Sequence, residues 1–314
     1  MSKISKRFKK FKLNVKEFLY RFKKNENTII EEHNGKNETS DKICFFASYD
    51  PDGLIDDYVI EYLKALQENN YDIYFCTTSS QKIRETDLIR MKQICVKIFR
   101  RENVGLDFCS WKLCYSKINP SKNYSQIVLT NDSILGPIFN LKPTFDAINH
   151  SYADFIGLTD NYEYSHHLQS YFLIFKENTI KNFLPKFMEN IKILFDKDKI
   201  IHSYEIGLST ELMAKNFKIE ALYPYNNIIK NIINDSNNDF AKKQVNPTTI
   251  LWDTLIVNFN YPFIKRELLT KNTVSLKSID NWFDIISKHN PDLAKTIVNY
   301  IQRTSKKNNL NCYL

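Results

Sequence analysis

The alternation of short apolar runs with helical patterns constrains the fold of this chain more than any other feature. Apolar runs of strand length cover residues 43–49, 71–77, 94–99, 126–130 and 155–159, and helical patterns cover residues 54–66, 81–91 and 107–118. Strands that alternate with helices in this way form a parallel sheet with helices on both faces. The sequence therefore predicts an α/β fold with a mainly parallel sheet flanked by helices.

The segments outside this pattern differ in composition and divide the chain. Residues 1–24 are basic, and residues 25–42 are polar with few apolar side chains, which is typical of a linker. We assign the sheet domain to residues 43–235 and a helical C-terminal extension to residues 236–314.

Within the C-terminal extension, two features predict packed helices. The apolar residues around Trp252, from 250 to 257, are typical of a helical core segment. The apolar pattern of residues 280–300 is interrupted at Pro291, which predicts two helices separated at that proline.

The net positive charge of the chain comes from its first residues. The net charge is +8, but residues 1–24 contain ten Lys or Arg and one Glu, a balance of +9 that leaves −1 for the rest of the chain. A neutral body without an aromatic and basic recognition module disfavours an RNA-binding protein, and we expect no nucleic-acid partner.

The apolar residues of the basic segment fall on one face of a helix. They recur at steps of four and three: Ile4, Phe8, Phe11, Val15, Phe18 and Phe22. A basic helix with such a stripe predicts contact with an anionic membrane surface, and docking on its own domain or on a partner is the alternative. The sequence shows no apolar run of about 20 residues and no signal-peptide core, so we expect a cytoplasmic protein at the inner face of the cell membrane.

The sequence lacks the motifs of several common enzyme classes. The chain has six glycines and neither GxGxxG nor GxxxxGK[ST], which argues against dinucleotide and P-loop enzymes. HExxH and GxSxG are also missing from the sequence, which argues against a zinc protease and a serine hydrolase. The six cysteines form no CxxC pair and lie mostly in apolar runs, where a thiol acts as a small hydrophobe.

Polar side chains follow three of the expected strands, where ligands bind in open parallel sheets. The candidates are Asp50 with Asp52, then Asn103, Gly105 and Asp107, and finally Asn131 and Asp132. Asp132 offers an oxygen ligand for Mg²⁺ or Mn²⁺ at a diphosphate. Turns and helix caps are the alternative explanation for all three groups.

A second set of candidates lies further along the chain. Asp160 ends the strand expected at residues 155–159, His167 follows in a polar and aromatic stretch, and Glu205 stands at the front of an expected helix. A carboxylate that takes the proton of an acceptor hydroxyl is one requirement of sugar transfer from a nucleotide-diphosphate donor. Glu205 is the candidate base, with Asp160 and His167 as the next candidates.

Seven motifs in the same order resemble the rhamnan synthesis protein F family, which is similar to the GT-A glycosyltransferases. They are RENVGLDF at 101–108, LTNDSILGP at 129–137, GLTD at 157–160, HLQSYF at 167–172, YEIGLS at 204–209, NPT at 246–248 and PFIKRELL at 262–269. The resemblance covers about residues 43–270. It implies a GT-A-like fold and an inverting glycosyltransferase of surface-polysaccharide or lipopolysaccharide biosynthesis, and it points more weakly to a dTDP-rhamnose donor.

The resemblance also implies partners and roles. The partners are a nucleotide-diphosphate sugar and a glycan or lipid-linked glycan acceptor. Asp132 would face the diphosphate, and Asn103, Gly105 and Asp107, together with Asp50 and Asn131, would shape the donor pocket.

Two motifs depart from the pattern of the GT-A enzymes. The paired-acid metal motif reads Asn131-Asp132-Ser133, with one carboxylate, and the Glu-Asp base motif reads Glu205-Ile206. The reduced acidic motifs keep an alternative open, a non-catalytic scaffold of glycan assembly that retains the fold.

Overall fold

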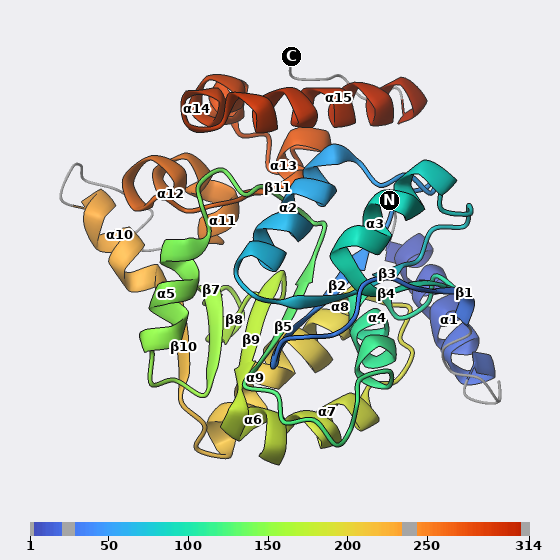
Figure 1. Ribbon diagram of the computed structural model, residues 1–314. Coiled ribbons are helices and arrows are strands. Elements are labelled where there is room, and N and C mark those ends of the chain that lie inside the picture. The colour runs from blue at the N-terminus through green and yellow to red at the C-terminus, as the bar shows by residue number, and fades with distance from the viewer. Residues whose placement is uncertain (1–2, 21–28, 234–243, 309–314) are drawn as a thin grey trace.

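The computed structural model describes residues 3–20, 29–233 and 244–308, and shows a central sheet between two layers of helices (Figure 1). The large sheet has the order β1-β4-β3-β2-β5-β9-β7-β10, with β8 paired to β7. Its strands are β1 Ile29–Asn34, β2 Lys42–Ser48, β3 Asp72–Thr77, β4 Cys95–Arg101, β5 Gln126–Asn131, β7 Phe155–Asn161, β8 His167–Leu168, β9 Phe172–Lys176 and β10 Ile219–Tyr223. A second, two-stranded sheet joins β6 Ile134–Leu135 to β11 Ile264–Lys265.

Most strands of the large sheet run in the same direction. β4, β3, β2 and β5 are parallel neighbours. β9 is antiparallel to both β5 and β7, so β7 runs with β5, and β10 is parallel to β7. The predicted α/β class with a mainly parallel sheet is confirmed. The carboxyl ends of β2, β3, β4, β5, β7 and β10 therefore lie at one edge of the sheet.

Both faces of the central strands are buried, which explains their continuous apolar runs. In β2, Cys44 and Phe46 join the core on one face, and Ile43, Phe45 and Ala47 join the core on the other. Successive side chains of a strand point to opposite faces, so the middle of β2, which is covered on both sides, is apolar at every position from 43 to 47.

Helices from both halves of the chain cover these two faces. One face packs against helices that include α2 Asp57–Glu68, α3 Glu85–Ile94, α5 Lys142–His150, α10 Tyr225–Ile233, α12 Trp252–Phe259, α14 Trp282–His289 and α15 Pro291–Asn308. The other face packs against α4 Leu106–Tyr115, α7 Leu184–Asn190 and α9 Gly207–Ala214, with α6 Glu177–Asn182 beside them. Shorter helices are α8 Lys197–Ile200, α11 Pro247–Ile250 and α13 Arg266–Thr270, and single turns of other helix types cover Ile201–Ile206 and Lys277–Asn281.

The C-terminal helices follow the prediction closely. Trp252 lies buried in α12, and α14 and α15 are separated at Pro291, so both expectations are confirmed. α15 lies across α2 and α13 at one side of the molecule (Figure 1). The C-terminal segment thereby closes the core beside α2 and reaches the carboxyl edge of the sheet.

Part of the expected linker belongs to the sheet. Residues 29–34 form β1, an edge strand antiparallel to β4, so the linker prediction for residues 25–42 is wrong over this part. Ion pairs such as Glu31 with Arg100, at 2.8 Å, hold this strand in place of an apolar run. An edge strand built on charged side chains carries no apolar signal in the sequence.

Helix α1, Lys3–Tyr20, docks on the body through a polar face. Glu17 is buried, accepts the backbone N–H of Phe195 at 3.0 Å and pairs with Lys199 at 2.8 Å. The ring of Tyr20 lies 5.4 Å from that of Phe195. Docking was the alternative to membrane contact, and the structure shows it for this face.

The opposite face of α1 carries Val15 and Phe18 of the predicted apolar stripe, with Leu19 beside them. Val15, Phe18 and Leu19 are 42%, 57% and 63% exposed. The side chains of Ile4, Phe8 and Phe11, and Phe22 as a whole, lie outside the described residues. Among the residues that are described, none of the helices is both long enough and apolar enough to cross a membrane.

We expect Ile297→Ala in α15 to lower the free energy of unfolding by about 2–5 kcal/mol, because it leaves a cavity in the core beneath this helix. Denaturant unfolding of the full chain measures the change. Lys295→Ala, on the exposed side of the same helix, is the control and should change stability by no more than about 0.5 kcal/mol. Equal effects of the two changes would show that α15 does not contribute to the core.

Candidate functional site

The carboxyl edge of the sheet gathers the expected donor-side residues. β2 leads to Asp50, β4 leads to Asn103 and Asp107, and β5 leads to Asp132. A hydrogen bond of 2.9 Å from the amide of Asn131 to Asp107 joins the segments after β4 and β5. The backbone N–H of Tyr49, beside Asp50, donates to Asp132 at 2.9 Å.

Asp132 is buried, and both of its oxygens are engaged. Oδ2 accepts hydrogen bonds from the hydroxyl of Ser48 at 2.8 Å and from the N–H of Tyr49. Oδ1 lies 3.1 Å from Nη1 of Arg266. The carboxylate is thus held by β2 on one side and by a cation from the C-terminal part of the chain on the other.

Strand pairing places Arg266 beside Asp132. β6 begins directly after Ser133 and pairs with β11 so that Lys265 lies opposite Ile134, and the N–H of Arg266 donates to the carbonyl of Ser133 at 2.8 Å. Arg266 lies in the motif at residues 262–269, for which no role was predicted. The two adjacent cations in PFIKRELL were the signal, although only the pairing of β6 with β11 shows what they face.

Asp107 lies close to the charge of Asp132. Burial raises the pKa of Asp107 to about 6, and the negative charge of Asp132 adds to the rise, against the lowering effects of Arg266 and Arg101. Asp107 is therefore protonated more readily near neutral pH than an ordinary aspartate.

The loop between β4 and α4 is held by a buried arginine that the sequence analysis did not single out. The guanidinium of Arg101 donates to the carbonyls of Val104 at 2.7 Å and Leu106 at 2.6 Å. Gly105 has a φ of 65°, and a Cβ there would lie 2.2 Å from Sγ of Cys109. Glycine is needed at this position by the backbone itself, and Asn103 is exposed on the same loop.

Asp50 forms a turn and binds an arginine from the C-terminal helix. Its Oδ1 accepts the N–H of Asp52 at 2.9 Å, which is the turn chemistry considered as the alternative for this residue. Its Oδ2 pairs with Arg303 of α15, which also contacts Asp52 at 3.1 Å and Asp56. The C-terminal helix is therefore fastened to the end of β2 by one cation and three carboxylates.

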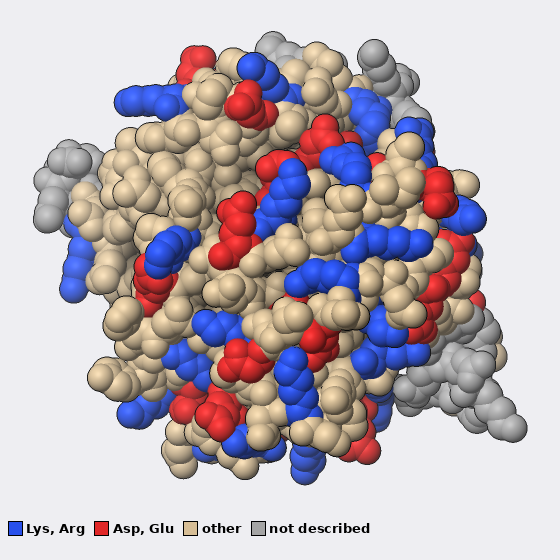
Figure 2. All heavy atoms as spheres, viewed as in Figure 1, with Lys and Arg blue, Asp and Glu red and all other residues tan. Residues whose placement is uncertain are grey.

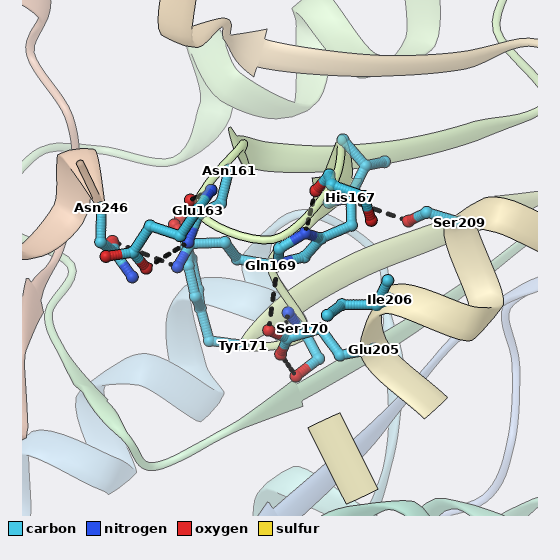
Figure 3. A network of polar contacts seen from close by, with 12 residues as sticks. Asn161, Glu163, His167, Gln169, Ser170, Tyr171, Glu205, Ile206, Ser209 and Asn246 are labelled. Carbon is cyan, nitrogen blue, oxygen red and sulfur yellow. Dashed lines mark hydrogen bonds and ion pairs between the residues drawn. The ribbon is translucent and has the colours of Figure 1, made fainter. Parts of the chain in front are cut away.

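Glu205 and His167 form an ion pair that ties the turn before α9 to β8 (Figure 3). Nε2 of His167 lies 3.4 Å from Oε1 of Glu205, and the N–H of Ser170 donates to Oε2 at 3.0 Å. The hydroxyl of Ser170 donates to the same oxygen. Burial works to raise the pKa of Glu205, but the hydrogen bonds from His167 and Ser170 outweigh it and lower the pKa below its usual value.

His167 supports Glu205 and does not itself face outward. Its side chain is 2% exposed, whereas that of Glu205 is 18% exposed. Nδ1 contacts the carbonyl of Ser165 at 2.7 Å, so both ring nitrogens are engaged within the protein. Burial works to lower the pKa of His167, but the hydrogen bond to Glu205 outweighs it and the pKa is raised.

Asp160 is turned toward a different part of the structure. In the β7–β8 pair, Asp160 lies opposite Leu168, and its neighbour Asn161 lies opposite His167. Its carboxylate accepts the N–H of Tyr225 at the start of α10, at 2.6 Å, and pairs with His166 at 3.1 Å. The structure thus brings His167 and Glu205 together and directs the Asp160 carboxylate toward α10.

Lys265 connects β11 to the Glu205 side of the site. Its ammonium lies 3.4 Å from Oδ1 of Asn246. The same Asn246 oxygen accepts a hydrogen bond from the side-chain amide of Gln169 at 3.3 Å (Figure 3). Burial lowers the pKa of Lys265 to about 8, although the charge of Glu205 opposes this change. Asn246 and Lys265 belong to the two C-terminal motifs, and no sequence argument gave them a place in the site.

The surroundings of Asp132 do not fit the expected Mg²⁺ or Mn²⁺. A divalent cation needs several oxygen ligands, but one oxygen of Asp132 accepts two hydrogen bonds and the other faces a guanidinium. Within residues 3–20, 29–233 and 244–308, no group of three or more His, Cys, Asp or Glu side chains is arranged to hold a metal ion.

Comparison with known proteins gives a family match and a curated relative. The family described as Rhamnan synthesis protein F matches residues 73–311. The relative is y4gN of Sinorhizobium fredii, named an uncharacterized protein, with 28% identity over 215 residues. The match covers 65% of this chain and 53% of y4gN, so the chain spans about half the length of this relative.

Two solved structures are also similar to the chain. The glycosyltransferase GlyE of Streptococcus pneumoniae is 8% identical, with 85% of this chain and 64% of that chain covered and a TM-score of 0.40. The galactosyltransferase LgtC, solved with donor and acceptor sugar analogs, is 10% identical, with 79% of this chain and 96% of that chain covered and a TM-score of 0.37. Neither likeness assigns a role to a residue of this chain.

The His167–Glu205 pair predicts a pH dependence of stability. The raised pKa of His167 contributes stability below its ordinary value of 6.5, and this is lost as pH rises through the pKa in the folded state. The lowered pKa of Glu205 contributes stability above 4.5, which is lost as pH falls through its folded-state pKa. Between these two ordinary values both contributions are present.

We therefore expect His167→Gln to cost about 1.5–3 kcal/mol of unfolding free energy at about pH 5.5, and less as the pH rises above the folded-state pKa of His167. Denaturant unfolding across the pH range measures this difference. His150→Gln, at an exposed histidine of α5, is the control and should show no such trend. A cost that stays constant with pH would mean that the pair is not ionic.

Proposed function

The chain belongs to the rhamnan synthesis protein F family, as its motifs predicted, and from that premise we propose that it is a glycosyltransferase. It would move a sugar from a nucleotide-diphosphate donor to a growing cell-surface polysaccharide or lipo-oligosaccharide. The acceptor would be a glycan or lipid-linked glycan, and dTDP-rhamnose is the donor that the family name favours.

The observation that carries this proposal is the arrangement around β11. Consecutive residues of the chain serve two groups: Lys265 is on the side of Glu205, and Arg266 is paired with Asp132. A transferase needs a place where a diphosphate departs and a place where an acceptor hydroxyl loses its proton. Asp132 with Arg266 and Glu205 with His167 supply candidates for these two places.

On the acceptor side, Glu205 would take the proton of the attacking hydroxyl. Its lowered pKa keeps the carboxylate ionised at neutral pH, and contacts with His167 and Ser170 hold its orientation. His167 would act as a positioning residue. An attack on the face of the anomeric carbon opposite the diphosphate would invert its configuration, in agreement with the mechanism expected from the resemblance.

On the donor side, the loops after β2, β4 and β5 would form the pocket. Arg101 fixes the loop that carries Asn103 and Gly105, so this part of the pocket is preorganised. Asp107 and Asn131 are bonded to each other beside Asp132 and would complete it.

The alternative is a non-catalytic scaffold with the same fold. One observation favours it: the donor-side carboxylates Asp50 and Asp132 are both paired with arginines from the C-terminal part of the chain. These ion pairs satisfy the two carboxylates within the protein, so the carboxyl edge of the sheet is stable without a bound ligand. The two functions differ in whether the protein turns over a donor.

We expect Glu205→Gln to retain the affinity for the donor and to lower turnover by on the order of 10²–10⁴, because the amide keeps the size of the side chain and removes its basicity. A panel of nucleotide sugars, screened first by thermal shift and then by release of nucleotide in the presence of an acceptor glycan, provides both measurements.

Glu211→Gln is the control, since this glutamate is exposed on α9 and pairs with Lys215. Normal turnover in Glu205→Gln would exclude it as the base. If donors bind to the wild-type protein but no sugar is transferred, the scaffold is favoured.

We also propose that α1 holds the protein on the cytoplasmic face of an anionic membrane. The helix binds its own body through a polar face and turns Val15, Phe18 and Leu19 outward, the reverse of an amphipathic helix that packs on a core. On the face drawn in Figure 2, Lys and Arg are interspersed with Asp and Glu among the described residues, so the basic charge of α1 is not continued there.

The double substitution Phe18→Ala and Leu19→Ala should weaken binding to anionic vesicles by at least about tenfold, since each side chain would bury apolar area in the lipid. Vesicle sedimentation measures this, and the binding of the wild-type protein should fall as salt rises. Ile89→Ala, at an exposed apolar residue of α3, is the control. Equal sedimentation of the double variant and the wild type would contradict membrane contact through this face.

A further inference from the structure

Arg266 faces Asp132, the carboxylate expected from the sequence to hold Mg²⁺ or Mn²⁺. The motif after β5 has one carboxylate, Asp132, and that carboxylate is bonded to Ser48 and Tyr49 on one oxygen. The other oxygen faces the guanidinium at 3.1 Å. A divalent ion at this oxygen would lie against a fixed positive charge, which repels it.

The guanidinium is held in a defined position. The backbone of Arg266 is fixed by the β6–β11 pairing and by the hydrogen bond from its N–H to the carbonyl of Ser133. The hydroxyl of Tyr58 is a further hydrogen-bonding partner of the guanidinium, and the charge of Asp132 favours its ionised form. An arginine held in this way keeps its charge at all physiological pH values and loses little entropy when it binds an anion.

The geometry leaves Arg266 more accessible than its carboxylate. The side chain of Arg266 is 22% exposed, and that of Asp132 is 8% exposed. A guanidinium carries five N–H donors in a planar fork that matches phosphate oxygens, so it can bind Asp132 on one edge and an anion on another.

We propose that Arg266 is the cation that binds the diphosphate of the donor, and that transfer by this protein needs no divalent metal. This inference rests on the proposed function and names the charge that acts in it. The bond between the anomeric carbon and the diphosphate oxygen breaks, and its electron pair goes to that oxygen, where Arg266 neutralises the charge. The acceptor oxygen forms the new bond to the anomeric carbon, and its proton goes to Glu205.

Asp132 then has a positioning role. It directs the guanidinium by charge and hydrogen bonding, and the loss of its charge would misplace Arg266 without removing the cation. Lys265, the preceding residue, adds a second positive charge on the side of Glu205. The β6–β11 pair therefore supplies positive charge to both halves of the site.

The test is isothermal titration of the full chain with inorganic pyrophosphate, dTDP, UDP and GDP, in buffer with EDTA and in buffer with Mn²⁺. We expect pyrophosphate and at least one nucleoside diphosphate to bind in EDTA, with less than about a threefold gain from Mn²⁺. Arg266→Met should weaken both ligands at least about tenfold, because the bidentate contact is lost, and Arg266→Lys should lie between these values.

Two further variants separate binding from folding. Arg266→Met with Asp132→Asn removes both charges of the pair, so the fold is not left with an unpaired buried carboxylate, and binding should remain weak. Lys36→Met removes the cation of a comparable pair with buried Asp72 at the opposite edge of the sheet, and should bind like the wild type. Thermal unfolding of each variant shows which of them are folded.

The inference is overturned if pyrophosphate binds only with Mn²⁺, if it does not bind in either buffer, or if the folded double variant binds it like the wild type. Its failure differs from failure of the proposed function. Diphosphates that bind through Arg266 without metal, in a protein that transfers no sugar, would leave Arg266 as the cation of the diphosphate site and remove the glycosyltransferase. Sugar transfer that requires Mn²⁺ would support the glycosyltransferase and overturn the inference about Arg266.

Discussion

The burial of the central strands on both faces is the constraint on which the rest of the structure depends. β2 is paired with β3 and β5 and contributes to two separate cores, so it has no polar face to expose. Helix α2 follows β2 and returns the chain to the start of β3, which keeps these two neighbouring strands parallel. The middle of β2 is apolar, and the polar side chains of the candidate site lie near and beyond the carboxyl ends of the strands.

Charges at this edge are buried with partners, and this determines what they can do. Asp132 is paired with Arg266, Asp50 with Arg303 and Glu205 with His167. A carboxylate that loses such a partner is left uncompensated in a region of low dielectric, at a cost of about 3–5 kcal/mol. In the proposed chemistry the same pairs would provide preorganised charge for a ligand, because the cations are already oriented before an anion binds. Stability and the proposed chemistry therefore use the same contacts.

The C-terminal part of the chain completes the site and does not simply extend the domain. α15 brings Arg303 to the end of β2, and the β6–β11 pairing brings Arg266 to Asp132 and Lys265 to the side of Glu205. Removal of this part would expose the core beneath α14 and α15 and would leave Asp50 and Asp132 without their cations. Helix α1 behaves differently, since it is bonded through Glu17 and leaves Val15, Phe18 and Leu19 exposed.

The sequence by itself determined the α/β class, the main strands, the C-terminal helix pair and the family, because each depends on local periodicity or on motifs that are contiguous in the chain. It also brought the candidates Asp107, Asp132 and Glu205 into view. It did not reveal β1, whose ion pairs carry no apolar signal, or the loop-fixing role of Arg101. Only the tertiary structure paired Arg266 with Asp132, Arg303 with Asp50 and His167 with Glu205, and directed Asp160 toward α10. The reason is physical: these contacts join residues far apart in sequence, and strand register and helix docking decide which charges meet.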